Sequence, residues 1–372
     1  MDRRLLVLCR SMPPSWGWSL PEQSDKRGHM SHVIGIFLAF CAGALGALTF
    51  ALIGFPAAAL TGSAVGVTLA GLAGLRFDLP VWMRNGAFVV LGINIGTGVT
   101  PETLQAAANW PLSIAVLAAS LPIGMAVSQA GMVRWMGFDR RDAVLASAPG
   151  HLSYVLSMSL EQGGDTARIA VIQSIRVLFL TLCVPLLVSS VFGASGADLL
   201  PVADMTVLSL VVLAVAALAL GYAYGWLRVP AAFLMAGMTV SALGHVLDLT
   251  PGRLSRELGF GAFLIMGTLI GSRFAGQSAA VLRGSVLAGL WLTLVNVVTA
   301  LGAMAVAMVL LGMSPAVLIV AYAPGGVEAM AAIAVTLGLD PAYVAAHHVM
   351  RLLILTFLVP LWVHRVGSGQ TR

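Results

Sequence analysis

The sequence predicts an all-α integral membrane protein, and three observations carry that prediction. Hydrophobic residues make up 59% of the 372 residues and charged residues only 9%, whereas about 25% of the residues in a soluble domain are charged. Apolar runs long enough to cross a bilayer, about 20 residues each, follow one another along the whole chain. The second half of the chain also repeats the pattern of the first. We therefore expect a polytopic bundle of about 10 to 12 spans.

A polar arm precedes the first apolar run. Residues 1–30 contain only one short apolar stretch, Leu5 to Cys9, which is too short for the core of a signal peptide. Met30 directly precedes the first span. We expect Met30 to be the real start, with the preceding arm either not translated or disordered.

Twelve apolar runs follow this arm. Those of the first half lie near residues 31–52, 55–74, 80–98, 109–131, 143–160 and 167–193. Those of the second half lie near residues 203–225, 228–248, 257–272, 283–312, 315–338 and 341–364. The chain contains 41 Gly and 17 Pro, so we expect several of these helices to be kinked or broken.

A constant offset of 175 residues aligns the two halves. It pairs Ala148-Pro149-Gly150 with Ala323-Pro324-Gly325, and it also aligns several single Gly, Thr and Arg positions. The chain therefore reads as a tandem duplication. One membrane repeat covers residues 31–193 and the other covers residues 203–365.

The number of crossings in each half decides whether the repeats are parallel or inverted. If the segments with Pro149 and Pro324 are re-entrant, each half crosses five times and the halves are inverted; if they span, each half crosses six times and the halves are parallel. The positions of the arginines in the loops favour inversion by a thin margin. Both arrangements place the C-terminus in the cytoplasm.

The charges help to orient the chain in a membrane. The net charge of +5 comes from 19 Arg and one Lys that lie mainly in short connections, which gives no basis for direct nucleic-acid binding. The three Cys residues have no CxxC spacing, so neither a disulfide framework nor a thiolate metal site is expected. The preference for Arg over Lys fits a bacterial gene of high GC content, and hence a bacterial inner-membrane protein.

The duplicated Pro-Gly elements are the first candidate site. Pro149 and Gly150 lie inside one apolar run, and Pro324, Gly325 and Gly326 lie inside another. Proline removes a backbone donor, so each run should contain a broken helix whose freed backbone groups can bind an ion or a polar substrate. A plain proline kink is the alternative, but duplication at matched positions favours a site.

Glu328 is the second candidate, because it is an acid inside a run that has no other charge. Ionisable groups within a membrane are costly and mark functional sites by default. The alternative is that Glu328 lies in a wet loop. The first half has Ser153 at the matching position, with His151 where the second half has Gly326; the two half-sites are therefore chemically unequal.

Two arginines follow the breaks and complete the candidate site. Arg176 and Arg351 occupy matching positions, and Gln173 and His348 precede them by one helical turn on the same face. Because arginine binds carboxylate or phosphate through two nitrogens, these pairs resemble a clamp for an anion. Arginines that extend to the lipid headgroups are the alternative, and an ion pair with Glu328 is a further option.

No other constellation in the sequence carries chemistry. His347 and His348 are adjacent, so both cannot readily bind one metal ion on a helix, and we expect no metal site and no cofactor. Asn94, Thr97 and Thr100 are weaker site candidates. No Walker loop or nucleophile elbow occurs, so we expect no catalytic residue and no enzyme.

These motifs are similar to those of the membrane AbrB-type family, which carries two AbrB-duplication domains. The resemblance rests on the segment from Ala323 to Met330, on Ala148 to His151, and on Gln173 to Arg176, and it covers residues 31 to 365. His348 replaces the Gln expected in the second half. The family is variously labelled ammonia monooxygenase or AbrB-like regulator, but the residues supply neither a copper or iron ligand set nor a soluble DNA-binding module.

The sequence therefore favours a secondary transporter or exporter of a small polar or anionic metabolite. Such a protein works by alternating access around a site at the bilayer midplane. A membrane-embedded sensor that changes gene expression through a protein partner is the alternative. The expected partners are the lipid bilayer, a small-molecule or ion ligand, and a second copy of the chain in a homo-oligomer.

Overall fold

The computed structural model describes residues 26–77, 79–99, 107–150, 152–193 and 204–368. Most of residues 1–30, and Thr100 and His151, lie outside these ranges. The described residues form α-helices and one short 3-10 turn, with a single isolated bridge between Asp204 and Arg253, which confirms the all-α class. The helices of the first half are α2 (Lys26–Leu52), α3 (Ala58–Leu72), α4 (Val81–Gly96), α6 (Trp110–Met136), α7 (Arg140–Ser147), α8 (Leu152–Glu161) and α9 (Thr166–Phe192).

The second half contains the same succession of long and short helices. At the offset of 175 residues, the bounds of α7 and α8 coincide with those of α14 and α15. The helices of this half are α10 (Val207–Trp226), α11 (Ala232–Val246), α12 (Arg256–Ser272), α13 (Ala279–Leu311), α14 (Pro315–Tyr322), α15 (Val327–Thr336) and α16 (Pro341–Ser368).

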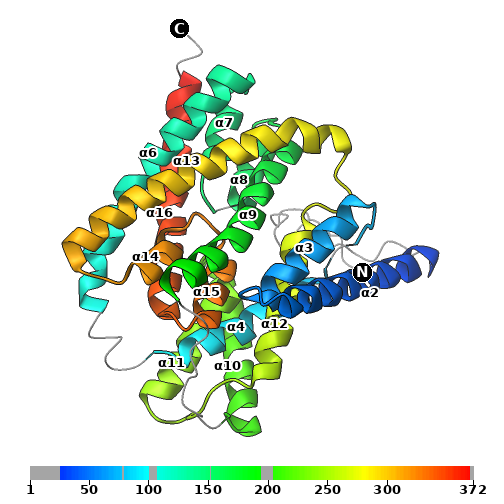
Figure 1. Ribbon diagram of the computed structural model, residues 1–372, viewed down its shortest axis with the longest axis vertical. Helices are drawn as coiled ribbons and strands as arrows, with labels where there is room; N and C mark the ends of the chain where they lie inside the picture. The colour runs from blue at the N-terminus through cyan, green and yellow to red at the C-terminus, as the bar shows by residue number, and fades with distance from the viewer. Residues whose placement is uncertain (1–25, 78, 100–106, 151, 194–203, 369–372) are drawn as a thin grey trace, which may run out of the picture.

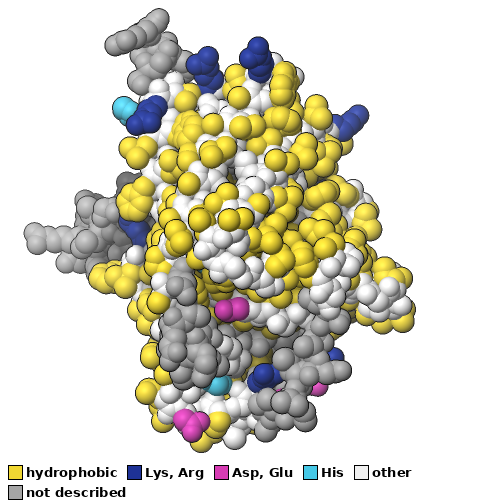
Figure 2. Space-filling view, turned by 60° about the vertical axis from the view of Figure 1, so that its left-hand side comes forward, with side chains coloured by type: hydrophobic (Ala, Val, Ile, Leu, Met, Phe, Trp, Pro, Cys, Tyr) yellow, Lys and Arg dark blue, Asp and Glu magenta, His cyan; other side chains and the backbone are white. Residues whose placement is uncertain are grey.

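The length and the apolar composition of the helices identify the chain as a membrane protein. Six helices in the described ranges are long and apolar enough to cross a bilayer, namely α2, α6, α9, α10, α13 and α16. The helices α3, α4, α11 and α12 have 15 to 17 residues, or about 22 to 26 Å at 1.5 Å per residue, which is less than the hydrocarbon core of about 30 Å. Apolar side chains cover most of the face seen in Figure 2, and Arg side chains gather at its upper end.

Helices from both halves combine into two units (Figure 1). The six-helix unit contains α2, α3 and α4 with α10, α11 and α12, in which α4 packs on α11 and α3 packs on α12. The crossing unit contains α6 to α9 with α13 to α16, in which α13 packs on α6 and α9. Neither unit is therefore one repeat, and each contains matching helices of both.

The broken segment of the first half is re-entrant. The backbone N–H of Asp165, just before α9, donates to the carboxylate of Asp142 at the start of α7, at 3.3 Å. The chain therefore enters the broken segment and leaves it at the same end. In keeping with this, α9 and α16 run in opposite directions in Figure 1, so the two repeats are inverted.

Close approaches between helices hold the six-helix unit together. A Cβ built on Gly92 of α4 would overlap the carbonyl oxygen of Leu234 of α11, and one on Gly237 would lie 2.6 Å from the carbonyl oxygen of Val89. A Cβ on Gly267 of α12 would likewise overlap the backbone of α3. Small residues let helix backbones approach in a membrane, where the hydrophobic effect does not drive helices together.

Candidate functional site

Two broken helices meet at the centre of the crossing unit. The first break separates α7 from α8 and contains Pro149 and Gly150, and the second separates α14 from α15 and contains Pro324 and Gly325. The carbonyl oxygen of Gly325 lies 3.5 Å from the position that a Cβ would occupy on Gly150. Gly150 has a φ of +109°, a conformation that side chains other than glycine rarely adopt. The duplicated Pro-Gly elements thus lie against each other.

Arg351 holds the second break in shape. Its side chain is 1% exposed, and its guanidinium donates to the carbonyl oxygens of Ala323 at 2.6 Å, Tyr322 at 3.0 Å and Ala321 at 3.1 Å. These carbonyls end α14, where the helix leaves its last acceptors without partners. Both terminal nitrogens of Arg351 are therefore engaged with the backbone, and its Nε has no partner.

Arg176 makes the corresponding contact in the first half, but more loosely. Its Nη1 lies 3.4 Å from the carbonyl oxygen of Ala148, and its Nη2 lies 3.5 Å from Oε1 of Gln173. Arg176 is fully buried, and its Nε has no partner. This guanidinium consequently has more capacity left for a ligand than that of Arg351.

Gln173 and His348 perform the same task with different side chains. Nε2 of Gln173 donates to the carbonyl oxygen of Leu145 at 3.2 Å, and its Oε1 accepts from Arg176. In His348, Nδ1 lies 3.4 Å from Nη1 of Arg351, so it must accept, and Nε2 donates to the carbonyl oxygen of Val320 at 3.0 Å. His348 is therefore a neutral tautomer that reproduces both hydrogen bonds of an amide.

A pair of adjoining cavities lies between the two units. Their volumes are about 250 Å³ and 480 Å³, and both are lined by Leu152, Val177, Ala231, Arg273, Gly326 and Glu328. Gly150, Gln173 and Arg176 line the smaller cavity, and Arg84 and Asn85 line the larger one. The cavities thus lie where the two Pro-Gly breaks of the crossing unit face the six-helix unit.

Glu328 lies in this cavity at the start of α15. It occupies the first turn of that helix, whose N-cap residue, Gly326, supplies no side-chain hydrogen bond. The first N–H groups of a helix lack partners within it, and the helix dipole adds positive charge there. Among the described residues that line the two cavities, Arg84, Arg176 and Arg273 and this helix end give an excess of positive charge over Glu328. An anion is the ligand that such a cavity favours.

The predicted site residues separate into two groups. Gly150, Gln173, Arg176, Gly326 and Glu328 line the cavity between the units. The remaining predicted residues support the breaks or lie on the other side of the crossing: Pro149, Pro324, Gly325, His348 and Arg351.

Sequence reasoning missed the contribution of the six-helix unit. Arg273, at the end of α12, and Arg84 of α4 are not among the site residues that the sequence predicts, yet both line the cavities between the units. The 175-residue offset places Gly98 opposite Arg273 and Gly259 opposite Arg84. The repeat, which pointed to the other arginines, therefore gave no signal for these two.

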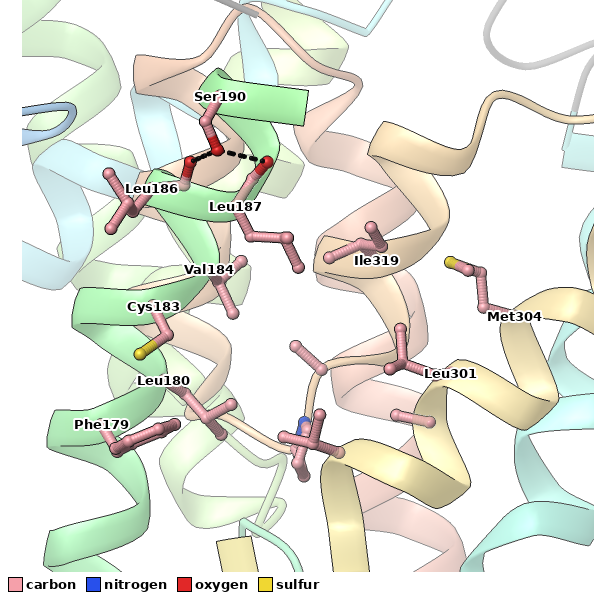
Figure 3. A pocket seen from close by; sticks show the side chains of 14 residues that line it. Phe179, Leu180, Cys183, Val184, Leu186, Leu187, Ser190, Leu301, Met304 and Ile319 are labelled. Carbon is pink, nitrogen blue, oxygen red and sulfur yellow. Dashed lines mark hydrogen bonds between the residues drawn. The ribbon is translucent and has the colours of Figure 1, made fainter. Parts of the chain in front are cut away.

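A separate apolar cavity of about 410 Å³ opens between α9, α13 and α14 (Figure 3). The side chains of Leu180, Val184, Leu301 and Met304 point into it. The hydroxyl of Ser190 donates to the carbonyl oxygens of Leu186 and Leu187. The cavity ends at Ala323 and Pro324 of the second break. Its described lining is apolar apart from Cys183 and Ser190.

Comparisons with known proteins identify a family and two relatives. A sequence profile of the family described as "Transition state regulatory protein AbrB" matches residues 60–367. The chain is 29% identical over 307 residues to "Uncharacterized protein YhjN" of Bacillus subtilis (strain 168), covering 75% of this chain and 77% of that protein. It is 26% identical over 235 residues to "Putative regulator AbrB" of Escherichia coli (strain K12), covering 61% of this chain and 66% of that protein.

Proposed function

The chain belongs to the AbrB family of membrane proteins, and from this premise we propose that it is a secondary transporter or exporter of a small polar or anionic metabolite. One observation carries the proposal. The cavity that holds Glu328 and Arg176 lies between two units, each built from both inverted repeats. Movement of one unit against the other can expose such a site to either side of a membrane in turn.

The residues divide the work of transport. Arg176 and Arg273 bind the anion, because both line the cavity and Arg176 has an unpartnered Nε. Glu328 couples a proton or a cation to the movement, because it is the acid of this cavity and lies beside the anion site. Arg351 and His348 keep the second break in shape and do not contact the substrate.

Flux across liposomes tests the proposal. Purified protein is reconstituted and loaded with each member of a panel of small carboxylates, phosphate esters and amino acids, and exchange is followed with and without a pH gradient. We expect saturable flux of an anion that is lost in Arg273→Ala. Arg283→Ala is the matched control, because Arg283 is an exposed arginine near the start of α13. Absence of saturable flux for the whole panel, in protein whose thermal stability no ligand changes, would refute transport.

A regulatory role is the second candidate, and it comes from the names "Transition state regulatory protein AbrB" and "Putative regulator AbrB". In that case the same cavity senses a metabolite and a protein partner transmits the signal. Binding without flux would favour this role. Ligand-dependent thermal stability that Arg273→Ala abolishes, together with the absence of exchange, is the pattern it requires.

We place the proposed transporter in a bacterial inner membrane, with its C-terminus in the cytoplasm. Arg365 in the last turn of α16 supports this orientation, since positively charged residues flanking spans remain on the cytoplasmic side. We propose no chemical reaction and no cofactor for this site.

A further inference from the structure

A small cavity lies on the other side of the crossing from the candidate transport site. It has a volume of about 20 Å³ and lies between Pro149 and Pro324 of the two breaks. Its polar lining comes from Ser120 of α6, Asn296 and Thr299 of α13, Tyr322 of α14 and Arg351 of α16. The hydroxyl of Tyr322 donates to the carbonyl oxygen of Ser113 at 2.7 Å. A volume above roughly 10 to 15 Å³ admits one water-sized occupant.

Two buried donors in this lining have no partner. Nδ2 of Asn296 and Nε of Arg351 are both buried and make no hydrogen bond, and their side chains are 4% and 1% exposed. A buried polar atom without a partner is rare in folded proteins and indicates an unobserved water or ion. Ser120 and Thr299 donate their own hydroxyl protons to backbone carbonyls.

The charge of Arg351 distinguishes an ion from water. Its hydrogen-bond partners are three backbone carbonyls and the neutral ring of His348. No carboxylate is among the described residues that line the cavity. The carbonyls at the end of α14 offer the guanidinium only the partial negative charge of a helix end. A buried cation within a membrane is costly unless a full opposite charge compensates it, and water would satisfy Nε–H without supplying that charge.

We propose that this cavity binds one monoatomic anion, such as chloride, between Asn296 and Arg351. The anion accepts hydrogen bonds from Nδ2 and Nε and neutralises the guanidinium that closes the end of α14. It is a structural ion of the crossing, and it occupies a different cavity from the transported anion. The proposal stands whether or not the protein is a transporter.

Halide-dependent stability tests the site. Detergent-solubilised protein is transferred to sodium gluconate, whose anion is much bulkier than a halide, and then titrated with sodium chloride or bromide at constant ionic strength. We expect a saturable rise in Tm with both halides, by mass action. Asn296→Leu should lose this rise. Thr293→Val is the control, because it removes another buried polar group of α13 that does not line the cavity, and it should keep the rise.

Asn296→Asp separates an anion site from a water site without relying on loss of function. The carboxylate takes the place of the ion beside Arg351, so this variant should be as stable in gluconate as the unmodified protein is in saturating chloride, and halide should no longer raise its Tm. Anomalous scattering from crystals grown in bromide should show one peak between Asn296 and Arg351. Equal Tm in gluconate and halide, or a halide response retained in Asn296→Leu, would overturn the proposal.

Discussion

Nη1 of Arg351 lies 2.6 Å from the carbonyl oxygen of Ala323, the residue that precedes the second Pro-Gly break. This contact answers a problem that a broken helix creates in a membrane, where no water is present to accept or donate hydrogen bonds. The last carbonyls of α14 carry the negative end of its helix dipole, and a guanidinium supplies both the donors and the compensating charge. The first half uses Arg176 and Ala148 in the same way, at 3.4 Å.

Replacing these two arginines should have unequal effects on stability. Arg351→Ala leaves three buried carbonyls without donors, so we expect a loss on the order of 3 kcal/mol or more. Arg176→Ala breaks only two long contacts and should cost clearly less. Thermal unfolding in detergent measures both. Equal losses of stability in the two variants would show that the shorter hydrogen bonds of Arg351 do not stabilise the protein more than the longer contacts of Arg176.

Exchange of His348 for glutamine should be tolerated. Glutamine can donate to the carbonyl oxygen of Val320 and accept from Arg351, as Gln173 does in the first half. His348→Leu provides neither group and should cost about 1 to 3 kcal/mol, because it leaves a buried carbonyl unpaired. Tm values of the two variants decide the matter. Equal damage from both would mean that the imidazole has a task that an amide cannot perform.

Much of the fold could be predicted from the sequence, because apolar run length and a constant offset act over whole helices. Composition was sufficient for the all-α membrane class, and the Pro-Gly elements marked the breaks. The equivalence of Gln173 and His348 could not be predicted from residue types alone. It depends on which ring nitrogen of His348 faces Arg351, and this is a matter of tertiary geometry.

The candidate site could be predicted only in part, because the repeat marks only those site residues that lie in segments matched between the two halves. Arg176 and Glu328 belong to the duplicated segments, whereas Arg273 has no counterpart that would distinguish it from a loop charge. The sequence also predicted that Arg176 and Arg351 together bind one anion, and it gave no sign that the two side chains lie apart. The two arginines line different cavities, and the two Pro-Gly breaks lie between those cavities.

Close packing in the six-helix unit predicts a sharp contrast between two glycines of one helix. Gly92→Ala places a methyl group on the carbonyl oxygen of Leu234, so we expect a loss of about 1 to 3 kcal/mol from overpacking. Gly86→Ala on the same helix meets no atom within 4 Å and should be neutral or stabilising, by up to about 1 kcal/mol. Thermal unfolding compares them, and similar values would contradict the packing of α4 on α11.

The most informative variant for the proposed transporter is Glu328→Gln. Glutamine has nearly the same shape but cannot lose a proton, so the coupled movement of a proton should stop while the fold is kept. We expect flux driven by a pH gradient to fall by an order of magnitude or more, and the remaining exchange to become independent of pH. The unchanged Tm of the variant would show that its fold is intact.

The matched control is Glu257→Gln, which removes an exposed acid from the first turn of α12, also at a helix N-terminus. This variant should keep the pH dependence of flux, because Glu257 does not line the cavities between the units. If Glu328→Gln retains the pH-dependent flux of the unmodified protein, Glu328 does not couple transport to protons. Arg176 and Arg273 would then bind the anion in a protein driven by another gradient.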